Sequence, residues 1–279
     1  MSDPKAHERT GRDAPGRPVL EVTGLHRAYG TVRAVDDVSF SLAAGASLGI
    51  VGESGSGKTT TARIIVGLER ADSGRVRING RDRTGHRRGR NERLARAKDV
   101  QMVFQDPFLS LDPRISVATA LREPLALHFP GRDHAARVAE LLDQVGLGRR
   151  LAESLPRQLS GGQRQRVAIA RALAVEPAVL VLDEAVAALD VSVQAQILNL
   201  LADIREQTGV GYLFITHDLG VVACVTDEVV VMREGRIVEA GPTTRVLAAP
   251  QHPYTRLLLE SVPRPGWNPH HIAATRRAL

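Results

Sequence analysis

A glycine-rich loop followed by a lysine and a threonine is the first part of the sequence whose residue types can do chemistry. The segment GESGSGKT (52–59) fits the pattern G-x-x-x-x-G-K-[ST], with a strand pattern before it and a helical pattern after it. Glycines allow the tight curl that points successive N–H groups at phosphate oxygens, beside the positive end of the following helix. Lys58 would reach the β- and γ-phosphates, and the Thr59 hydroxyl would be a ligand of Mg²⁺. The alternative is a glycine loop that only caps a helix. The expected phosphate-binding residues are Gly52, Ser54, Gly55, Ser56, Gly57, Lys58, Thr59 and Thr60.

Two adjacent carboxylates end a second apolar segment. VLVLDE (179–184) is a run of valines and leucines, typical of a parallel strand buried on both faces, that ends in Asp183 and Glu184. We expect Asp183 to bind Mg²⁺ and Glu184 to polarise an attacking water. Adjacent residues on an extended strand point to opposite sides, so the two acids are expected to serve different tasks. The alternative is an ordinary acidic pair on the surface.

A third motif, LSGGQRQR (159–166), runs into the helical stretch VAIARALA. Ser160 is expected to cap a helix whose first residues, Gly161 and Gly162, have no side chains, which gives a second helix end able to receive phosphate. If the glycine-rich loop already binds a nucleotide, the helix end after Ser160 has no ligand of its own in that site. The motif therefore favours two copies of the chain, or two related chains, that face each other head to tail. The alternative is a simple helix cap.

The elements that must position these motifs alternate between strands and helices. Strand patterns occur at 19–25, 35–45, 47–52, 73–80, 178–184 and 211–217, and a two-residue Glu-Gly turn could join two more segments, 228–235 and 235–241, as a hairpin. Helical spacing occurs at 117–127, 135–146, 163–175 and 192–207. The pattern predicts an α/β core interrupted by a helical insertion at about 106–176.

The basic residues argue against a nucleic-acid partner. The formal net charge is +6, and 34 of the 37 basic residues are arginines. A protein that binds nucleic acid is expected to interleave arginines with stacking aromatics, yet only 9 of 279 residues are Phe, Tyr or Trp. The densest basic segment, 81–96, has no aromatic residue, so we expect a solvated face there. Contact with acidic lipid headgroups or an acidic partner is the alternative.

Composition also bears on compartment. No run approaches the roughly 18 to 20 apolar residues of a membrane span, and the first residues lack the apolar centre of a secretory signal, so we expect a cytoplasmic chain. Cys224 is the single cysteine, which excludes an internal disulfide or a four-cysteine metal centre made by this chain alone. Residues 1–17 are polar and interrupted by Pro and Gly, and we expect a disordered tail.

Together the three motifs resemble those of ATP-binding cassette (ABC) subunits of transporters, above all importer ATPases that serve oligopeptides, dipeptides and nickel. The resemblance covers roughly residues 19–263, and its family-specific parts are 101–114, 189–201 and 250–263 (PQHPYTRLLLESVP). It implies an α/β fold with a P-loop NTPase (RecA-like) core, an antiparallel β subdomain and an inserted α-helical subdomain. It further implies an ABC ATPase domain at 18–241 and an oligopeptide/dipeptide-transporter-type C-terminal extension at 242–279.

The resemblance implies further roles at matching positions. Tyr29 resembles the aromatic that stacks on adenine, and Gln105 resembles the glutamine that touches Mg²⁺ and water and links the nucleotide site to membrane subunits. His217 resembles the switch histidine that contacts the γ-phosphate, Asp190 resembles the aspartate that crosses the dimer seam, and Gln163 belongs to the second phosphate-binding motif. The alternatives are a buried core tyrosine, an ordinary loop amide and a structural histidine.

Two positions depart from the family pattern. Ala185 follows the catalytic glutamate where proline is usual, and Ala188 precedes Asp190 by two residues where serine is usual. Loss of the proline should loosen the turn, and loss of the hydroxyl removes one potential hydrogen bond across the dimer, a cost of about 0.5 to 1.5 kcal/mol. We expect weaker coupling between the two sites rather than loss of hydrolysis.

The resemblance implies an ATPase that, with ATP and Mg²⁺, drives import of peptides from the cytoplasmic face of the membrane. The implied partners are a second ABC ATPase subunit, either the same chain or a paralogue, two membrane permease subunits and, indirectly, a solute-binding protein. Nickel, glutathione and sugar stay open as cargo. A hydrolytically weak partner subunit and a soluble ABC protein without a transporter are the rival functions. The intact Lys58, Asp183, Glu184 and His217 disfavour the first rival, and the single cassette without sustained heptads disfavours the second.

Overall fold

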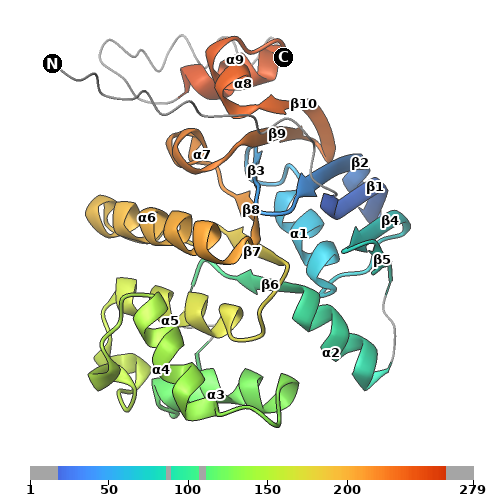
Figure 1. The fold of residues 1–279 in the computed structure, drawn as a ribbon. Helices are drawn as coiled ribbons and strands as arrows, with labels where there is room; N and C mark the ends of the chain where they lie inside the picture. The colour runs from blue at the N-terminus through green and yellow to red at the C-terminus, as the bar shows by residue number, and fades with distance from the viewer. Residues whose placement is uncertain (1–17, 86–88, 107–110, 262–279) are drawn as a thin grey trace, which may run out of the picture.

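Two β-sheets, one antiparallel and one mostly parallel, form the framework of the chain (Figure 1). The computed structural model describes residues 18–85, 89–106 and 111–261, so the predicted tail at 1–17 and the chain end at 262–279 lie outside the described residues. The smaller sheet has the order β2-β1-β4-β5, and the larger has the order β10-β9-β3-β8-β7-β6. The strands are β1 (Pro18–Tyr29), β2 (Val32–Ala43), β3 (Ser47–Val51), β4 (Ser73–Ile78), β5 (Arg81–Asp82), β6 (Val100–Val103), β7 (Val179–Asp183), β8 (Gly211–Ile215), β9 (Glu228–Arg233) and β10 (Arg236–Pro242).

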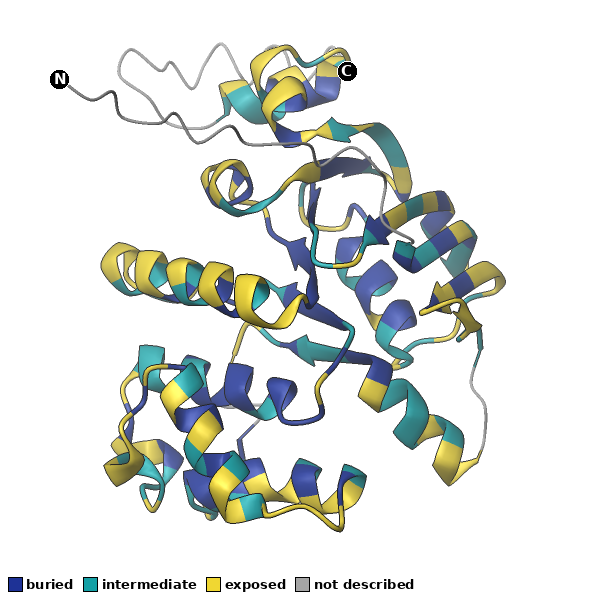
Figure 2. Ribbon diagram, in the orientation of Figure 1, coloured by how far each residue is buried: buried dark blue, intermediate teal, exposed yellow. Residues whose placement is uncertain are grey.

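The larger sheet is parallel from β9 to β6, with β10 antiparallel at one edge. Strand β7 is buried on both faces, because Val179 and Val181 join one hydrophobic cluster while Leu180 and Leu182 join another. Figure 2 shows the central strands of this sheet as buried. The predicted α/β core is therefore confirmed.

One face of the larger sheet is covered by the helices between β6 and β8. These are α3 (Val117–His128), α4 (His134–Gln144), α5 (Gly161–Leu173) and α6 (Val191–Thr208), with 3₁₀ turns at Arg149–Leu151 and Pro156–Gln158. Elsewhere in the described residues lie α1 (Lys58–Val66), α2 (Arg90–Asp99), α7 (Leu219–Val225), α8 (Thr243–Ala248) and α9 (Pro253–Glu260). Apolar side chains of α3, α4, α5 and α6 form one cluster with β6, β7 and β8. Helices α3 to α5 lie together below the sheet in Figure 1 and form the inserted α-helical part.

The opposite face of the sheet packs on α1 and on the smaller, antiparallel sheet. Ile64 and Ile65 of α1 lie in this cluster with Leu20 and Val22 of β1 and with Ile50 of β3. The helix that follows the glycine-rich loop is thus fixed between two sheets. The antiparallel β subdomain expected from the resemblance is present.

The C-terminal helices cover the edge of the larger sheet beside β9. Val246 of α8 and Tyr254 of α9 pack with Val51 of β3 and Val229 of β9. The hairpin from β9 to β10 turns at Glu234 and Gly235, which have φ of +50° and +82°, so the two-residue Glu-Gly turn is confirmed. Within the described residues, no helix has the length and apolar character needed to cross a membrane.

The arginine-rich segment 81–96 is only partly a solvated face. Arg93 is exposed, as expected. Arg83, however, pairs with Asp99, and the Arg96 guanidinium donates to the carbonyl oxygens of Ile64 (2.7 Å) and Ile65 (2.9 Å). Burial lowers the pKa of Arg96 to about 10. The interpretation of the whole segment as solvated is therefore wrong, because Arg96 binds carbonyl groups in the last turn of α1.

Candidate functional site

The glycine-rich loop closes tightly between β3 and α1. Gly52 has φ of +152°, and a Cβ there would lie 2.2 Å from the carbonyl oxygen of Met232. Gly57 has φ of +102°, and its Cβ would lie 2.1 Å from the carbonyl oxygen of Ala34. At both positions the backbone of another strand occupies the place of a side chain. The glycines of the motif are thus required by close packing as well as by backbone conformation.

Lys58 is buried, and its ammonium group lies inside the loop. Its Nζ donates to the carbonyl oxygens of Gly52 and Glu53, each at 2.7 Å. Burial lowers the pKa of Lys58, and the negative charges of Glu184 and Asp183 partly oppose this effect. Its third partner is the Ser56 hydroxyl at 3.2 Å, and a desolvated ammonium ion with only uncharged hydrogen-bond partners is stabilised when an anion approaches. Phosphate oxygens would supply that charge.

The first turn of α1 leaves its N–H groups available to a ligand. Gly57 at the N-cap makes no side-chain cap, and the first turn contains no acidic residue. Thr59 and Thr60 follow Lys58 in this turn and are half-buried, while Ser54 is exposed on the loop. The uncapped positive end of a helix next to a buried lysine is a binding site for an anion such as a polyphosphate.

Asp183 ends β7 with one buried oxygen, Oδ1, that has no hydrogen-bond partner. Burial raises the pKa of this carboxyl group, and the charge of Glu184 raises it further. Arg63 and Lys58 of α1 and a hydrogen bond with Thr59 act in the opposite direction. A buried carboxylate oxygen without a donor is a site where a cation can be bound.

These residues fit Mg²⁺. Among the described residues, no group of three or more His, Cys, Asp or Glu side chains is placed to hold a metal ion. Mg²⁺ does not need such a group, because proteins usually bind it through one or two carboxylates together with water and substrate phosphates. Asp183, with its free oxygen, and the hydroxyl of Thr59 beside it are the donors that this chain offers.

Glu184 and His217 lie next to each other at the ends of β7 and β8. His217 Nδ1 is 3.0 Å from Glu184 Oε1. Glu184 has φ of +47°, and its N–H donates to the carbonyl oxygen of Ile215 at 2.8 Å. The two acids do have different partners, but the expected reason, alternation along an extended strand, is wrong because Glu184 has left the strand. A left-handed backbone at a non-glycine residue is typical of functional sites.

The turn after Glu184 is closed by its own hydrogen bonds. Ala187 N–H donates to the carbonyl oxygen of Glu184 at 3.0 Å, and Ala185, where the family has proline, is buried. Ala188 is exposed. Asp190 is also exposed, at the N-cap of α6, and its side chain makes no capping hydrogen bond. Its carboxylate therefore remains accessible beyond the helix it precedes.

Ser160 caps α5 as the sequence predicts. Its hydroxyl accepts from Gln163 N–H, and the Gln163 side chain accepts from Ser160 N–H at 2.9 Å. Gly162 lies against α6, where a Cβ would be 2.5 Å from Val193 Cγ1. The capped helix end and the start of α6 after Asp190 are consequently neighbours.

Within one chain, the two phosphate-binding motifs lie on opposite faces of the larger sheet. Helix α1 packs with Val179 and Val181 of β7, whereas α5 packs with Leu180 and Leu182 on the other face. The start of α5 is therefore not part of the cavity formed by the glycine-rich loop. Lys58, Asp183, Glu184 and His217 belong together at the ends of neighbouring strands, but Ser160, Gly161 and Gly162 do not join them.

Tyr29 ends β1, and the residue is 46% exposed. The Arg27 guanidinium lies 4.6 Å from the centre of the ring and is itself paired with Glu69 and Asp72. The alternative of a buried core tyrosine is wrong. An exposed, oriented aromatic ring is suited to stacking on a base.

Gln105 is exposed just after β6, beside the gap in the description at 107–110. A cavity of about 930 Å³ lies between β6 and the helical part, and Phe104, Leu111 and Glu123 are among its lining residues. By the same resemblance, Phe108 and Leu109 are expected near a contact with membrane subunits, but both lie outside the described residues. Gln105 itself does not line this cavity, but it directly follows Phe104, which does, and it lies outside the helices and strands.

Residues 35–187 match the profile of the family described as ABC transporter. The chain belongs to the ABC transporter family. Residues 238–277 also match a second profile, the C-terminal region of oligopeptide/dipeptide transporters. This second match includes helices α8 and α9.

Curated members of the family are similar over most of the chain. A glutathione import ATP-binding protein, GsiA of Escherichia coli (strain K12), is 48% identical over 261 residues, which are 89% of this chain and 42% of GsiA. An oligopeptide transport ATP-binding protein, OppD of Mycobacterium tuberculosis, is 51% identical over 242 residues, which are 86% of this chain and 39% of OppD. The chain spans about two fifths of the length of these relatives.

Solved ABC structures have the same fold. The cbiO1 protein from Clostridium perfringens, part of the transporter complex cbiONQ, has a TM-score of 0.75 at 29% identity and covers 83% of this chain and 91% of its own. The dimeric ATP-binding cassette MJ0796 in a post-hydrolysis state with ADP and Pi has a TM-score of 0.72 at 28% identity, covering 80% and 98%. The fold expected from the resemblance is confirmed.

Two residues near the site were not found by sequence reasoning. Arg63, one turn after Thr59 on α1, lowers the pKa of Asp183. Tyr254 of α9 accepts a hydrogen bond from the N–H of Glu53 in the glycine-rich loop, at 3.0 Å. Helical spacing could have placed Arg63 on the face of Thr59, but no local pattern connects Tyr254 with a loop 200 residues earlier.

Asp183→Asn should increase the free energy of unfolding of the nucleotide-free protein by about 1 kcal/mol at pH 7, because it removes a buried charge with an unpaired oxygen. Because the pKa of Asp183 is raised in the folded protein, its charge destabilises the fold only above the pKa of the unfolded chain, which is about 4. The difference in stability between the two proteins should therefore shrink below that pH. Urea unfolding at pH 7 and near pH 4 measures both. Asp203→Asn, on the exposed face of α6, is the matched control and should change stability by less than about 0.5 kcal/mol. A less stable Asp183→Asn protein at pH 7 would contradict this account.

Proposed function

We propose that the chain is the ATP-hydrolysing subunit of an ABC importer for peptides, acting with Mg²⁺ at the cytoplasmic face of the membrane. The observation that carries this proposal is the set of Lys58, Asp183, Glu184 and His217 at the ends of β3, β7 and β8, next to an uncapped helix N-terminus. Its family membership supports the same activity.

The chemistry asked of these residues is positioning and charge stabilisation. Lys58 would contact the β- and γ-phosphates, while the loop from Gly52 to Gly57 and the N–H groups of α1 bind the remaining phosphate oxygens. Mg²⁺, bound by Asp183 and Thr59, would neutralise phosphate charge. Glu184 would orient the water and accept its proton, and His217, in contact with Glu184, would stabilise the γ-phosphate.

We infer that the active unit is a head-to-tail pair of cassettes. Ser160, Gly161 and Gly162 start a helix on the opposite face of the sheet from α1, so they reach a nucleotide only on a facing subunit. The exposed Asp190, close to the same helix end, would lie in that seam, and Gln163 would orient Ser160. The dimeric MJ0796 cassette supports this arrangement. Tyr29 would stack on the adenine of its own subunit.

The motion of the pair would be transmitted to two membrane permease subunits. The cleft of about 930 Å³ between β6 and α3 has an apolar part that includes Leu111 and Phe104, the residue before Gln105. A permease segment that fits this cleft would sense the position of Gln105, which itself would contact Mg²⁺ and the attacking water. A solute-binding protein outside the membrane would act through the permeases.

Peptide is the cargo that the C-terminal match supports, since residues 238–277 fit the oligopeptide/dipeptide transporter region. Glutathione is the second candidate, because GsiA is described as a glutathione importer and is 48% identical. Both cargoes contain peptide bonds. The cassette itself would contact neither.

Glu184→Gln should lower ATP hydrolysis by roughly 10²- to 10⁴-fold while ATP binding persists, because the amide cannot accept the proton of water. The protein should accumulate as an ATP-bound dimer in size-exclusion chromatography with Mg²⁺ and ATP. Glu206→Gln, on the exposed side of α6, is the control and should hydrolyse at the unmodified rate. An undiminished rate for Glu184→Gln would show that another group activates water.

Two inactive variants should restore activity when mixed if each site is shared. Ser160→Arg blocks the helix end of one subunit, and Lys58→Ala disables the phosphate loop of the other, so a mixed dimer keeps one intact site. An equal mixture should recover roughly a quarter of the unmodified phosphate release. Mixing Lys58→Ala with Glu184→Gln is the control, since both changes damage the same side of a site and no recovery is expected. No recovery in the first mixture would refute the shared site.

The cargo can be tested in vesicles that contain the chain with the permeases and solute-binding protein found in its gene neighbourhood. Oligopeptide-loaded binding protein should increase ATP hydrolysis several-fold over the unloaded protein, because cargo shifts the complex toward the closed cassette pair. Glutathione and Ni²⁺ are tested in parallel. Stimulation by glutathione alone, with no response to oligopeptides, would replace peptide by the second candidate.

A further inference from the structure

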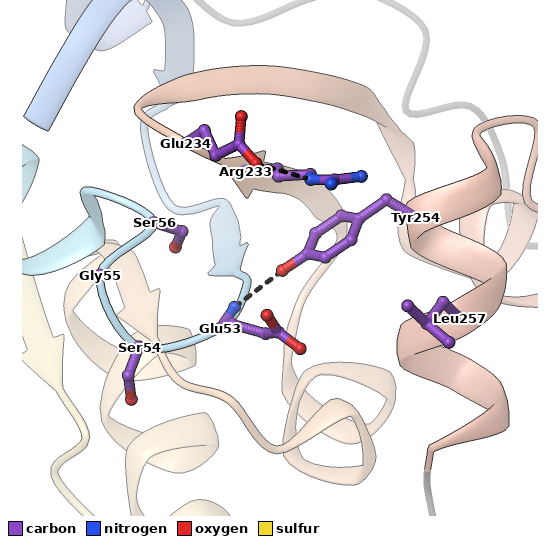
Figure 3. A pocket seen from close by; sticks show the side chains of 8 residues that line it. All are labelled: Glu53, Ser54, Gly55, Ser56, Arg233, Glu234, Tyr254 and Leu257. Atoms are coloured by element: carbon purple, nitrogen blue, oxygen red, sulfur yellow. Dashed lines mark hydrogen bonds and ion pairs between the residues drawn. The ribbon is translucent and has the colours of Figure 1, made fainter. Parts of the chain in front are cut away.

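The C-terminal helix α9 contacts the glycine-rich loop directly. The N–H of Glu53, the second residue of the loop, donates to the hydroxyl oxygen of Tyr254 at 3.0 Å. Figure 3 shows this contact, with the tyrosine ring extending from α9 toward the loop. Tyr254 is 3% exposed, so water does not compete freely for its hydroxyl.

The loop is supported on this side by a second backbone contact. Gly235 N–H, in the turn between β9 and β10, donates to the carbonyl oxygen of Ser56 at 3.1 Å. Gly52 lies against the backbone of β9 at Met232. Hydrogen bonds from outside the loop therefore fix both halves of it, one to the hairpin and one to α9.

Tyr254 is itself fixed at the start of α9. The carboxylate of Glu239, on β10, accepts from the N–H groups of Gln251 (2.8 Å) and His252 (3.1 Å), which anchors the segment before the helix. His252 caps α9 by accepting from Tyr254 N–H. Arg233 lies over the ring, with Cζ 5.1 Å from its centre. A side chain held at its backbone, ring and hydroxyl can determine the position of its partner.

A cavity lies beside the glycine-rich loop, so the Tyr254 hydroxyl contributes more to the position of the loop on this side than side-chain packing does. It has a volume of about 280 Å³ and is lined by loop residues from Glu53 to Ser56 together with Arg233, Glu234, Tyr254 and Leu257 (Figure 3). The outer side of the loop is therefore not tightly covered by side chains. Within this open space, a directed hydrogen bond can limit how far the loop moves.

We propose that Tyr254 is a positioning residue of the nucleotide site, through which the C-terminal extension holds the phosphate-binding loop in the conformation that receives ATP. This inference rests on the proposed ATPase function. It gives segment 250–263, which the sequence marks only as family-specific, a role in nucleotide binding. Binding of the phosphates needs an ordered loop, and each contact that orders it beforehand lowers the cost of binding.

Tyr254→Phe tests the inference, because it removes the hydroxyl and leaves the ring and its contact with Arg233. In the full chain, the KM and Kd for ATP should rise about three- to tenfold, with kcat changed less than twofold. Hydrogen exchange of the loop amides, measured by mass spectrometry without nucleotide, should become faster. Tyr212→Phe is the matched control. Its buried hydroxyl donates to the Leu201 carbonyl oxygen at 2.8 Å, and Tyr212 pairs with Ser47, at the other end of β3 from the loop.

The outcomes separate the inference from the proposed function. Weaker ATP binding and faster loop exchange in Tyr254→Phe but not in Tyr212→Phe support the inference. Unchanged ATP affinity in Tyr254→Phe, or an equal loss in both variants, overturns it. If the unmodified chain binds no ATP, the proposed function fails, and loop exchange alone then decides whether Tyr254 orders the loop.

Discussion

The structure depends on keeping a desolvated ammonium group and a desolvated carboxylate close together at one edge of a parallel sheet. The hydrogen-bond partners of Lys58 are two backbone carbonyls and the Ser56 hydroxyl, none of them charged, and Asp183 keeps one buried oxygen unpaired. Burial disfavours the charged form of each group, so their pKa values shift in opposite directions. Neither arrangement favours the empty protein. Both would become favourable with a bound polyphosphate and its cation, and a rigid sheet with two glycines packed against neighbouring backbone holds them in place without these ligands.

The order of strands brings the chemistry together. Strands β3, β8 and β7 are parallel neighbours, so their carboxyl ends lie at the same edge, and each is followed by a part of the site. The loop follows β3, His217 follows β8, and Asp183 and Glu184 end β7. The start of α5 is excluded from this edge because its apolar face packs on the opposite side of the sheet. The same burial pattern that stabilises one chain therefore keeps its two phosphate-binding motifs apart, which is the basis of the proposed shared site.

The sequence predicts the parts of the site that local patterns encode. Glycine spacing, buried strand composition and a capping serine correctly locate the loop, β7 and the start of α5, because each depends on neighbouring residues. Prediction from the sequence fails where a contact joins segments that are far apart in the chain. Arg96 was interpreted as a solvated arginine, yet it binds the last turn of α1. The separation of Asp183 and Glu184 was attributed to strand alternation, but it arises from a left-handed turn at Glu184. No periodicity in the chain reports either contact.

The glycine-rich loop is held in place by residues that lie outside the segment matched by the ABC profile. The ABC profile ends at residue 187, whereas the hairpin from β9 to β10 and helix α9 come after it. Nevertheless, Gly235 binds Ser56, Met232 lies against Gly52, and Tyr254 binds Glu53. The C-terminal extension is thus packed on the nucleotide site, with its apolar residues in the same cluster as Val51 at the end of β3. The extension therefore contacts the glycine-rich loop through one hydrogen bond and one shared cluster, both within a single chain.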